Sequence, residues 1–184
     1  TGSEPLDDGE IRYKGGGVDG LKPHRVARRG IGRTFQIIRI FPELTALENL
    51  LVATWQPLDV AHRRALEMLQ LVTLDRLQSE YAGNLSYGQQ KLLEFARVLM
   101  TDPDLILLDE PAAGVNRTLL NDLLEAIRQL RAQGKTILIV EHDMKVVMDL
   151  SEKIFVLDYG EKIAEGPPSA IQSDDRVMEA YFGR

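Results

Sequence analysis

Several features are scarce in this sequence, and each scarcity argues against a class of protein. None of the 184 residues is cysteine, so neither disulfide bonds nor thiolate zinc ligands can stabilise the fold. No apolar run approaches the roughly 18 to 20 residues that span a bilayer, so we expect any membrane association to depend on other proteins. Acidic residues outnumber basic ones, 28 to 22, which disfavours nucleic acid as a partner.

The first half of the chain changes from strand-like to helical patterning. Segment 9–21 has short β-type pieces around a glycine cluster, which predicts an antiparallel hairpin. Segment 30–35 is a strand candidate that ends at Gln36. From Leu44 to about Met100 the apolar residues recur at helical spacing, which predicts a helical subdomain.

The second half predicts an α/β fold. Segments 105–109 and 136–140 are continuously apolar, as expected for parallel strands that are covered on both faces. Segment 117–131 has one apolar stripe and is expected to be a helix. Segment 153–166 predicts a further strand that turns at 159–160 into an antiparallel return. This alternation of strands and helices implies a core built on a parallel sheet.

Polar side chains follow three of the predicted strands. Gln36 follows the first, Asp109 and Glu110 end the second, and Glu141 and His142 follow the third. Parallel strands place their carboxyl ends on one edge of a sheet, where ligands bind. We therefore expect these side chains to form a single site.

The acidic pair suits metal-dependent hydrolysis. Asp109 offers the hard oxygen ligands that Mg²⁺ prefers, and Glu110 is placed to orient or deprotonate a water molecule. Two acids after a strand can equally be a solvated turn, but Pro111 fixes the exit of the chain and favours the functional interpretation. Gln36 and His142 are uninformative alone. Next to the acidic pair, His142 could donate a hydrogen bond to a terminal phosphate.

The segment "LSYGQQ", residues 85–90, is the most specific local pattern. Ser86 followed by Gln89 predicts a capping box at the start of a helix. An ordinary helix cap is a sufficient explanation for this spacing. A capped helix end with a small residue, Gly88, also offers N–H groups and positive dipole to an anion such as phosphate.

A phosphate-binding loop of the form G-x-x-x-x-G-K-[ST] is absent from the sequence. Segment 15–22, "GGGVDGLK", has Leu21 where the lysine is required. Segment 30–35, "GIGRTF", has no glycine five positions before Gly32. Neither segment can grip phosphates in the manner of such a loop.

Together these motifs resemble the ATPase subunits of ATP-binding-cassette (ABC) transporters. Gln36, "LSYGQQ", "LILLDEP" at 105–111 and "VEHD" at 140–143 match in order and spacing the Q-loop, signature, Walker B and switch-histidine motifs. The further segments "GIGRTFQIIRIFPELTALENLLVA", "DEPAAGVN" and "VMEAYFG" are similar to the branched-chain amino-acid importer branch. The resemblance covers nearly the whole chain.

The resemblance implies a function and site residues. Glu110 would be the general base, Asp109 and Gln36 would bind Mg²⁺, partly through water, and His142 would contact the γ-phosphate of ATP. Ser86, Gly88 and Gln89 would bind the ATP of an opposite subunit. The catalytic residues would thus be Glu110, His142 and Gln36, and the cofactors ATP and Mg²⁺.

The resemblance also implies partners and a division of the chain. A second ATPase subunit would complete the sites, permease subunits would dock near Ile37–Glu48, and a substrate-binding protein would act indirectly. The chain itself would lie peripherally at the cytoplasmic face of the inner membrane. The expected fold is a P-loop NTPase-like sheet with an inserted helical subdomain and small hairpins. Its parts would be 1–43 with the Q-loop, 44–101 with the signature motif, and 102–184 with the Walker B motif.

Three functional hypotheses are compatible with the absence of a phosphate loop. We expect the chain to be a truncated cassette that lacks the first strand and the Walker A loop and is nearly inactive alone. Losing three charge-assisted hydrogen bonds at about 1.5 kcal/mol each weakens nucleotide binding roughly a thousandfold. The alternatives are a non-catalytic module that lends only its signature motif, and a cassette for another substrate, such as exported lipid.

Overall fold

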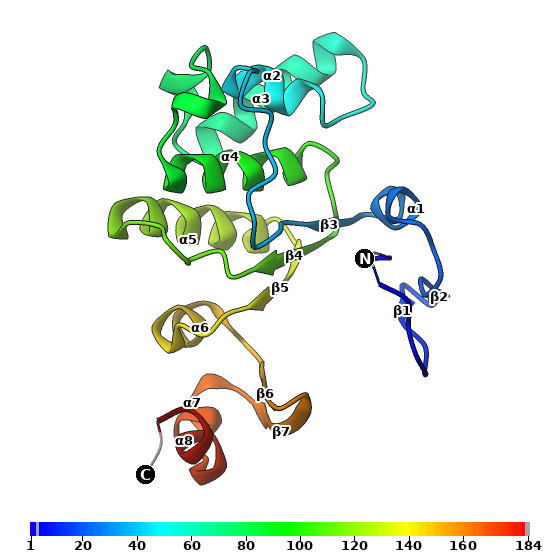
Figure 1. Cartoon of the computed structure of the whole chain (residues 1–184), viewed down its shortest axis with the longest axis vertical. Helices are drawn as coiled ribbons and strands as arrows, with labels where there is room; N and C mark the ends of the chain where they lie inside the picture. Colours follow the sequence, from blue (N-terminus) through cyan, green and yellow to red (C-terminus); the bar gives the residue numbers. More distant parts are fainter. Residues whose placement is uncertain (3, 183–184) are drawn as a thin grey trace. The chain divides into compact units, whose positions relative to one another are not determined.

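The computed structural model describes residues 1–2 and 4–182. They divide into two compact units, Thr1–Val140 and Glu141–Arg184. Strands and helices alternate in the first unit around a parallel sheet, and the second unit contains an antiparallel hairpin with helices (Figure 1). The predicted α/β class is therefore confirmed.

The parallel sheet has the strand order β3-β4-β5. Its strands are β3 (Ile31–Arg33), β4 (Leu105–Asp109) and β5 (Thr136–Val140). The register pairs Arg33 with Leu107 and Asp109 with Val140. Strand β3 is shorter than predicted because pairing stops at Arg33, so Gln36 lies in the following loop and not at the strand end.

Three helices of the first unit contact one another and cover the region predicted to be helical (Figure 1). They are α2 (Ala46–Leu51), α3 (Leu58–Leu71) and α4 (Tyr87–Leu99). Two short 3-10 helices, Asp75–Leu77 and Ala82–Asn84, connect α3 to α4. Helix α4 also contacts β3 and α5 (Arg117–Ala132), so it joins this helical cluster to the sheet.

The predicted N-terminal hairpin is also present. Strands β1 (Arg12–Tyr13) and β2 (Gly16–Gly17) pair antiparallel across a turn in which Lys14 and Gly15 have positive φ. A short helix, α1 (Pro23–Arg28), follows and was not predicted. Its six residues are too few to show an apolar periodicity.

Strand β5 departs from the prediction that it is covered on both faces. Leu138 is 51% exposed and Val140 is 56% exposed, whereas Ile106 and Leu108 of β4 are buried. Strand β5 is also an edge strand of the sheet among the residues described. A continuous apolar run predicts a strand, but it cannot show which of its faces is packed.

The described residues of the second unit form one hairpin and three helices. These are α6 (Met144–Leu150), β6 (Ile154–Asp158), β7 (Glu161–Gly166), α7 (Pro168–Gln172) and α8 (Asp175–Phe182). The predicted turn at Tyr159-Gly160 is present, and β6 pairs antiparallel with β7. The parallel sheet of the described chain thus contains three strands, and β6 is not one of them.

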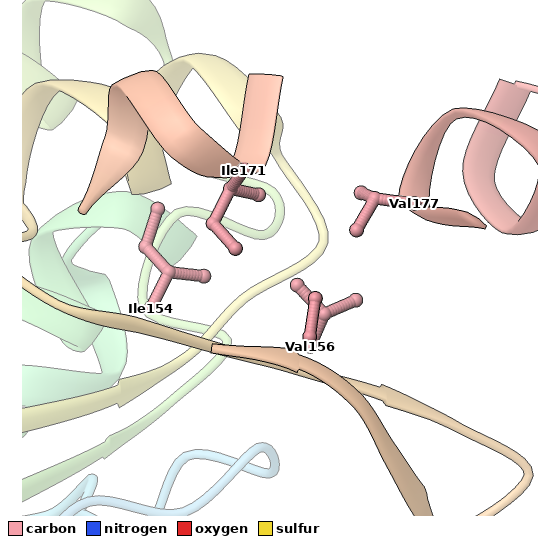
Figure 2. Packing of buried hydrophobic residues seen from close by; sticks show 5 residues of the cluster. Ile154, Val156, Ile171 and Val177 are labelled. Atoms are coloured by element: carbon pink, nitrogen blue, oxygen red, sulfur yellow. The ribbon is translucent and has the colours of Figure 1, made fainter. Parts of the chain in front are cut away.

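The core of the second unit is small and aliphatic. Ile154 and Val156 lie on one face of β6, and Ile171 and Val177 approach them from α7 and α8 (Figure 2). All four side chains are at most 8% exposed. Within the described ranges, the helices are all too short or too polar to cross a bilayer.

Candidate functional site

The predicted acidic pair lies at the carboxyl end of β4, the central strand of the parallel sheet. Asp109 is the last residue of β4. The main-chain N–H of Glu110 donates to the Val140 carbonyl oxygen at 2.9 Å, which extends the pairing by one residue. Glu110 then turns with φ of +46°, a left-handed conformation that is uncommon for residues other than glycine. The chain therefore bends sharply at the predicted base.

Gln36 and Glu110 contact each other although 74 positions separate them. The Gln36 amide nitrogen, Nε2, donates to Glu110 Oε2 at 3.2 Å. Gln36 is exposed and Glu110 is half-buried. The loop after β3 therefore reaches the end of β4, and two of the predicted site residues are adjacent.

Arg33 is a member of this site that the sequence interpretation missed. Its Nη2 lies 3.2 Å from Asp109 Oδ2, and both side chains are about one-third exposed, at 33% and 31%. Thr34 Oγ1 accepts from the Asp109 main-chain N–H at 3.3 Å. The available signal was the position of Arg33 in a strand next to the acidic pair, because neighbouring strands bring such side chains together.

Lys91 was also missed, and it is buried. Its side chain is on α4, is 8% exposed, and donates from Nζ to the Glu110 carbonyl oxygen at 2.8 Å. A main-chain oxygen at a sharp bend needs a partner, and Lys91 supplies one. The signal in the sequence was a lysine among residues of α4 that face the core.

The predicted capping box at the start of α4 is confirmed. The Gln89 N–H donates to Ser86 Oγ at 3.4 Å, and the Ser86 N–H donates to Gln89 Oε1 at 2.9 Å. Ser86 is exposed, so its helix end is accessible. Gly88 is buried, and a Cβ there would lie 2.8 Å from Leu119 Cδ1. A packing constraint against α5 therefore accounts for this glycine.

His142 belongs to the second unit. It follows β5 by two residues, is exposed, and its main-chain N–H donates to Glu141 Oε2 at 3.0 Å. The approach of its imidazole to the other predicted site residues stays a prediction.

The oxygen atoms at the end of β4 suit a metal ion that is bound by the protein together with other ligands, and not by protein side chains alone. Across residues 1–2 and 4–182, no three His, Cys, Asp or Glu side chains gather as a metal cluster. Asp109 contributes a carboxylate, and Gln36 contributes an amide oxygen nearby. Mg²⁺ commonly uses one or two carboxylates with waters and phosphate oxygens. These residues therefore fit Mg²⁺ that is held jointly with a triphosphate.

Comparisons with known sequences identify the family of this chain. Residues 1–113 match the family model described as ABC transporter, and residues 161–184 match that of the branched-chain amino acid ATP-binding cassette transporter. The chain is 41% identical to the high-affinity branched-chain amino acid transport ATP-binding protein BraF of Pseudomonas aeruginosa and 38% identical to LivG of Escherichia coli. Each match covers 100% of this chain and 79% of the relative.

Solved structures resemble the fold closely. The ADP conformation of MJ1267, an ATP-binding cassette of an ABC transporter, has a TM-score of 0.86 and 32% identity over 100% of this chain and 80% of that one. A dimeric post-hydrolysis state of the cassette MJ0796, bound to ADP and Pi, has a TM-score of 0.79 and 28% identity, covering 90% and 75% of the two chains.

Proposed function

The chain belongs to the ABC transporter family, and from this membership we propose that it is the ATP-hydrolysing subunit of a branched-chain amino-acid importer. The family is that of nucleotide-binding ATPases. The substrate class is supported by the names of BraF and LivG and by the match of residues 161–184. Importers of related amides would use the same ATPase chemistry.

The observation that carries this proposal is the contact between Gln36 and Glu110 beside Asp109. An amide that holds a carboxylate next to a second carboxylate can position a water molecule for attack on phosphate. An ordinary solvated turn would not require a partner from a loop that is 74 positions away.

Each residue has a distinct role in the proposed reaction. Glu110 accepts a proton from the attacking water, and Gln36 orients both the carboxylate and the water. Asp109 and the Gln36 amide oxygen would hold the metal, directly or through water. Mg²⁺, when bound, would neutralise phosphate charge. Lys91 holds the Glu110 peptide through its carbonyl oxygen and so helps to position this residue.

His142 is proposed to donate a hydrogen bond to the terminal phosphate. Its place two residues after β5 supports this role, because parallel strands present their ends at one edge. An imidazole there could sense whether the γ-phosphate is present.

Ser86, Gly88 and Gln89 are proposed to act on the ATP of a second subunit. The exposed cap of α4 supports this role, since helix N-termini bind phosphates. Cassettes of this family work as dimers, and MJ0796 is dimeric with ADP and Pi bound. The genes encoded beside this one would show whether the second subunit is another copy of this chain or a homologue.

The permease subunits are proposed to dock on residues Ile37–Glu48. Ile37 is 80% exposed and Phe41 is 49% exposed, and exposed apolar side chains favour protein partners. The protein would then lie peripherally at the cytoplasmic face of the inner membrane. Within it, we propose the functional divisions 1–43, 44–101 and 102–184. A substrate-binding protein would act through the permease.

Transport by a reconstituted complex tests this function. The whole gene product that contains this chain would be placed in proteoliposomes with the membrane subunits encoded beside its gene, and ATP-dependent uptake of leucine would be measured. We expect Glu110→Gln to reduce uptake by about a hundredfold or more, because a general base contributes this much. Glu161→Gln, on the exposed hairpin, is the matched control. Full uptake by Glu110→Gln would refute the assignment of the base.

The isolated 184-residue chain offers a second test. Because its sequence has no phosphate-loop pattern, we expect negligible ATP hydrolysis by the purified chain. Robust Mg-dependent turnover, abolished by Glu110→Gln, would show that the loop is dispensable.

A further inference from the structure

Arg33, at the end of β3, is held in place by contacts with three other residues. Its Nη2 lies 3.2 Å from Asp109 Oδ2, and its Nη1 donates to Thr1 Oγ1 at 3.0 Å. Its guanidinium also lies over the Phe35 ring, with Cζ 5.1 Å from the ring centroid. These contacts leave the side chain little freedom, so its positive charge stays beside Asp109. The proposed hydrolysis gives Arg33 no role.

The contact with Arg33 engages one oxygen of the Asp109 carboxylate. Oδ2 accepts from Arg33, and across residues 1–2 and 4–182 no hydrogen bond involves Oδ1. Thr34 restrains the main chain of the same residue, because its Oγ1 accepts from the Asp109 N–H at 3.3 Å. A carboxylate that is restrained in this way presents its second oxygen in a defined direction. That arrangement suits Mg²⁺, which requires near-octahedral ligand geometry.

The acidic pair is balanced by two basic side chains that contact it. Arg33 contacts the Asp109 carboxylate, and Lys91 Nζ donates to the Glu110 carbonyl oxygen at 2.8 Å. The two negative and two positive charges sum to zero. A positive charge beside a metal ligand repels a free divalent cation, but it attracts a complex of that cation with a nucleotide, whose net charge is negative. This charge balance therefore favours the complex.

The expected size of this charge effect depends on screening by solvent. The Arg33 and Asp109 side chains are 33% and 31% exposed, so water weakens the interactions of their charges. Even with the dielectric constant of water, a unit charge about 5 Å from a divalent cation changes its affinity roughly tenfold. A neutral hydrogen-bond donor would orient Asp109 as well, but only a cation adds this effect. The charge of Arg33 is therefore the property to test.

We propose that Arg33 makes the metal position selective for a metal–nucleotide complex over the free cation. It does so by holding Asp109 Oδ2 and by placing a positive charge beside the metal ligand. Because Arg33 acts through Asp109, it is a positioning residue. The favoured ligand is a nucleoside di- or triphosphate with a divalent cation bound. This inference rests on the proposed function, in which Asp109 holds Mg²⁺.

Binding of Mn²⁺ to the whole gene product that contains this chain tests the selectivity. Electron paramagnetic resonance of free Mn²⁺ gives the dissociation constant of the cation alone, and calorimetry with ADP in excess Mn²⁺ gives that of the complex. Arg33→Gln keeps an amide donor but loses the charge. We expect it to lower the ratio of the two constants, free cation over complex, by about tenfold. Arg33→Lys keeps the charge and should keep the wild-type ratio.

Two further variants make the outcome specific. Arg25→Gln is the matched control, because it removes one positive charge from the exposed surface of α1, and it should leave the ratio unchanged. An unchanged ratio in Arg33→Gln, or an equal fall in Arg33→Lys, would overturn the role of the charge. Asp109→Asn should weaken the binding of free Mn²⁺. If it does not, the assignment of Asp109 as a metal ligand is wrong, and the proposed function fails at that point.

The wild-type protein gives a second test, which does not depend on the folding of a variant. Nuclear magnetic resonance would follow the Nε–H signals of Arg33 and Arg25 during titration with ADP, with and without Mg²⁺. We expect the Arg33 signal to shift mainly when Mg²⁺ is present, because its partner Asp109 then becomes a metal ligand, and the Arg25 signal to stay unchanged. Equal shifts with and without Mg²⁺ would show that Arg33 contacts the nucleotide directly. That result, or no shift at all, would overturn its action through Asp109.

Discussion

Glu94 on α4 and Glu165 on β7 both lie near cationic side chains, but their pKa values shift in opposite directions. Burial raises the pKa of Glu94, although an N–H from Arg39 and nearby cations oppose the change. Hydrogen bonds from Lys153 and then Lys162 lower the pKa of Glu165 to about 2. The number of neighbouring cations therefore does not decide the sign; the loss of solvent around the carboxylate does.

The same contrast separates two regions of the molecule. Helix α4 places Lys91 and Glu94 inside the first unit, where both are less than 9% exposed. The β6–β7 hairpin carries its lysine-glutamate cluster on an exposed surface. Exposed ion pairs contribute little to stability, whereas a buried polar group without its partner is costly. We expect charged residues of α4 to be sensitive to mutation and those of the hairpin to tolerate it.

The largest expected effect is at Lys91. Lys91→Met removes the donor to the Glu110 carbonyl oxygen, and we expect it to lower the free energy of unfolding by about 2 kcal/mol. Lys153→Met on the hairpin is the matched control and should change it little. Urea unfolding followed by circular dichroism measures both. Equal destabilisation by the two variants would contradict the contrast between the regions.

A smaller effect is expected at Glu94, and it depends on pH. Because the pKa of Glu94 is raised on folding, its contribution to stability is full below the ordinary value of 4.5 and declines as pH rises through the folded value. Glu94→Gln keeps an acceptor for the Arg39 N–H and lacks this decline. We therefore expect the variant to gain stability relative to the wild type as the pH rises above 4.5. A parallel pH dependence of both proteins would refute this.

The smallest effect is expected at Glu165. Its lowered pKa means that its contribution is present above about pH 4.5 and is lost as pH falls toward 2. A carbon-detected titration of the side chain should show a midpoint near pH 2 at low salt. Since the cluster is exposed, 1 M NaCl should move the midpoint toward 4.5. A midpoint that does not change with salt concentration would show that the cluster is shielded from solvent.

Sequence patterns predicted the long elements and the capped helix, because each depends on local chemistry. The apolar stripe of 117–131 became α5, and the Ser86–Gln89 pair became a capping box. Turn chemistry predicted the return at Tyr159-Gly160. Short elements such as α1 carry too few residues for a periodic signal and were missed.

Contacts across the fold could not be derived in the same way. Parallel-strand reasoning predicted that Gln36 and the acidic pair share an edge, and their hydrogen bond agrees with that. Arg33 and Lys91 were missed because their partners are a side chain and a main-chain oxygen far away in sequence. The prediction that β5 is covered on both faces was wrong, because a run of apolar residues does not specify which neighbours pack against it.

Helix α4 connects the predicted base, Glu110, with a distant point on the protein surface. The helix begins at the exposed Ser86 and, within its first turns, reaches the bent peptide of Glu110 through Lys91. At about 1.5 Å per residue, five residues span roughly 8 Å of rigid backbone. A tilt of this rod, imposed where a neighbouring molecule presses on the serine, would thus be transmitted as a rotation of the peptide that aims the base.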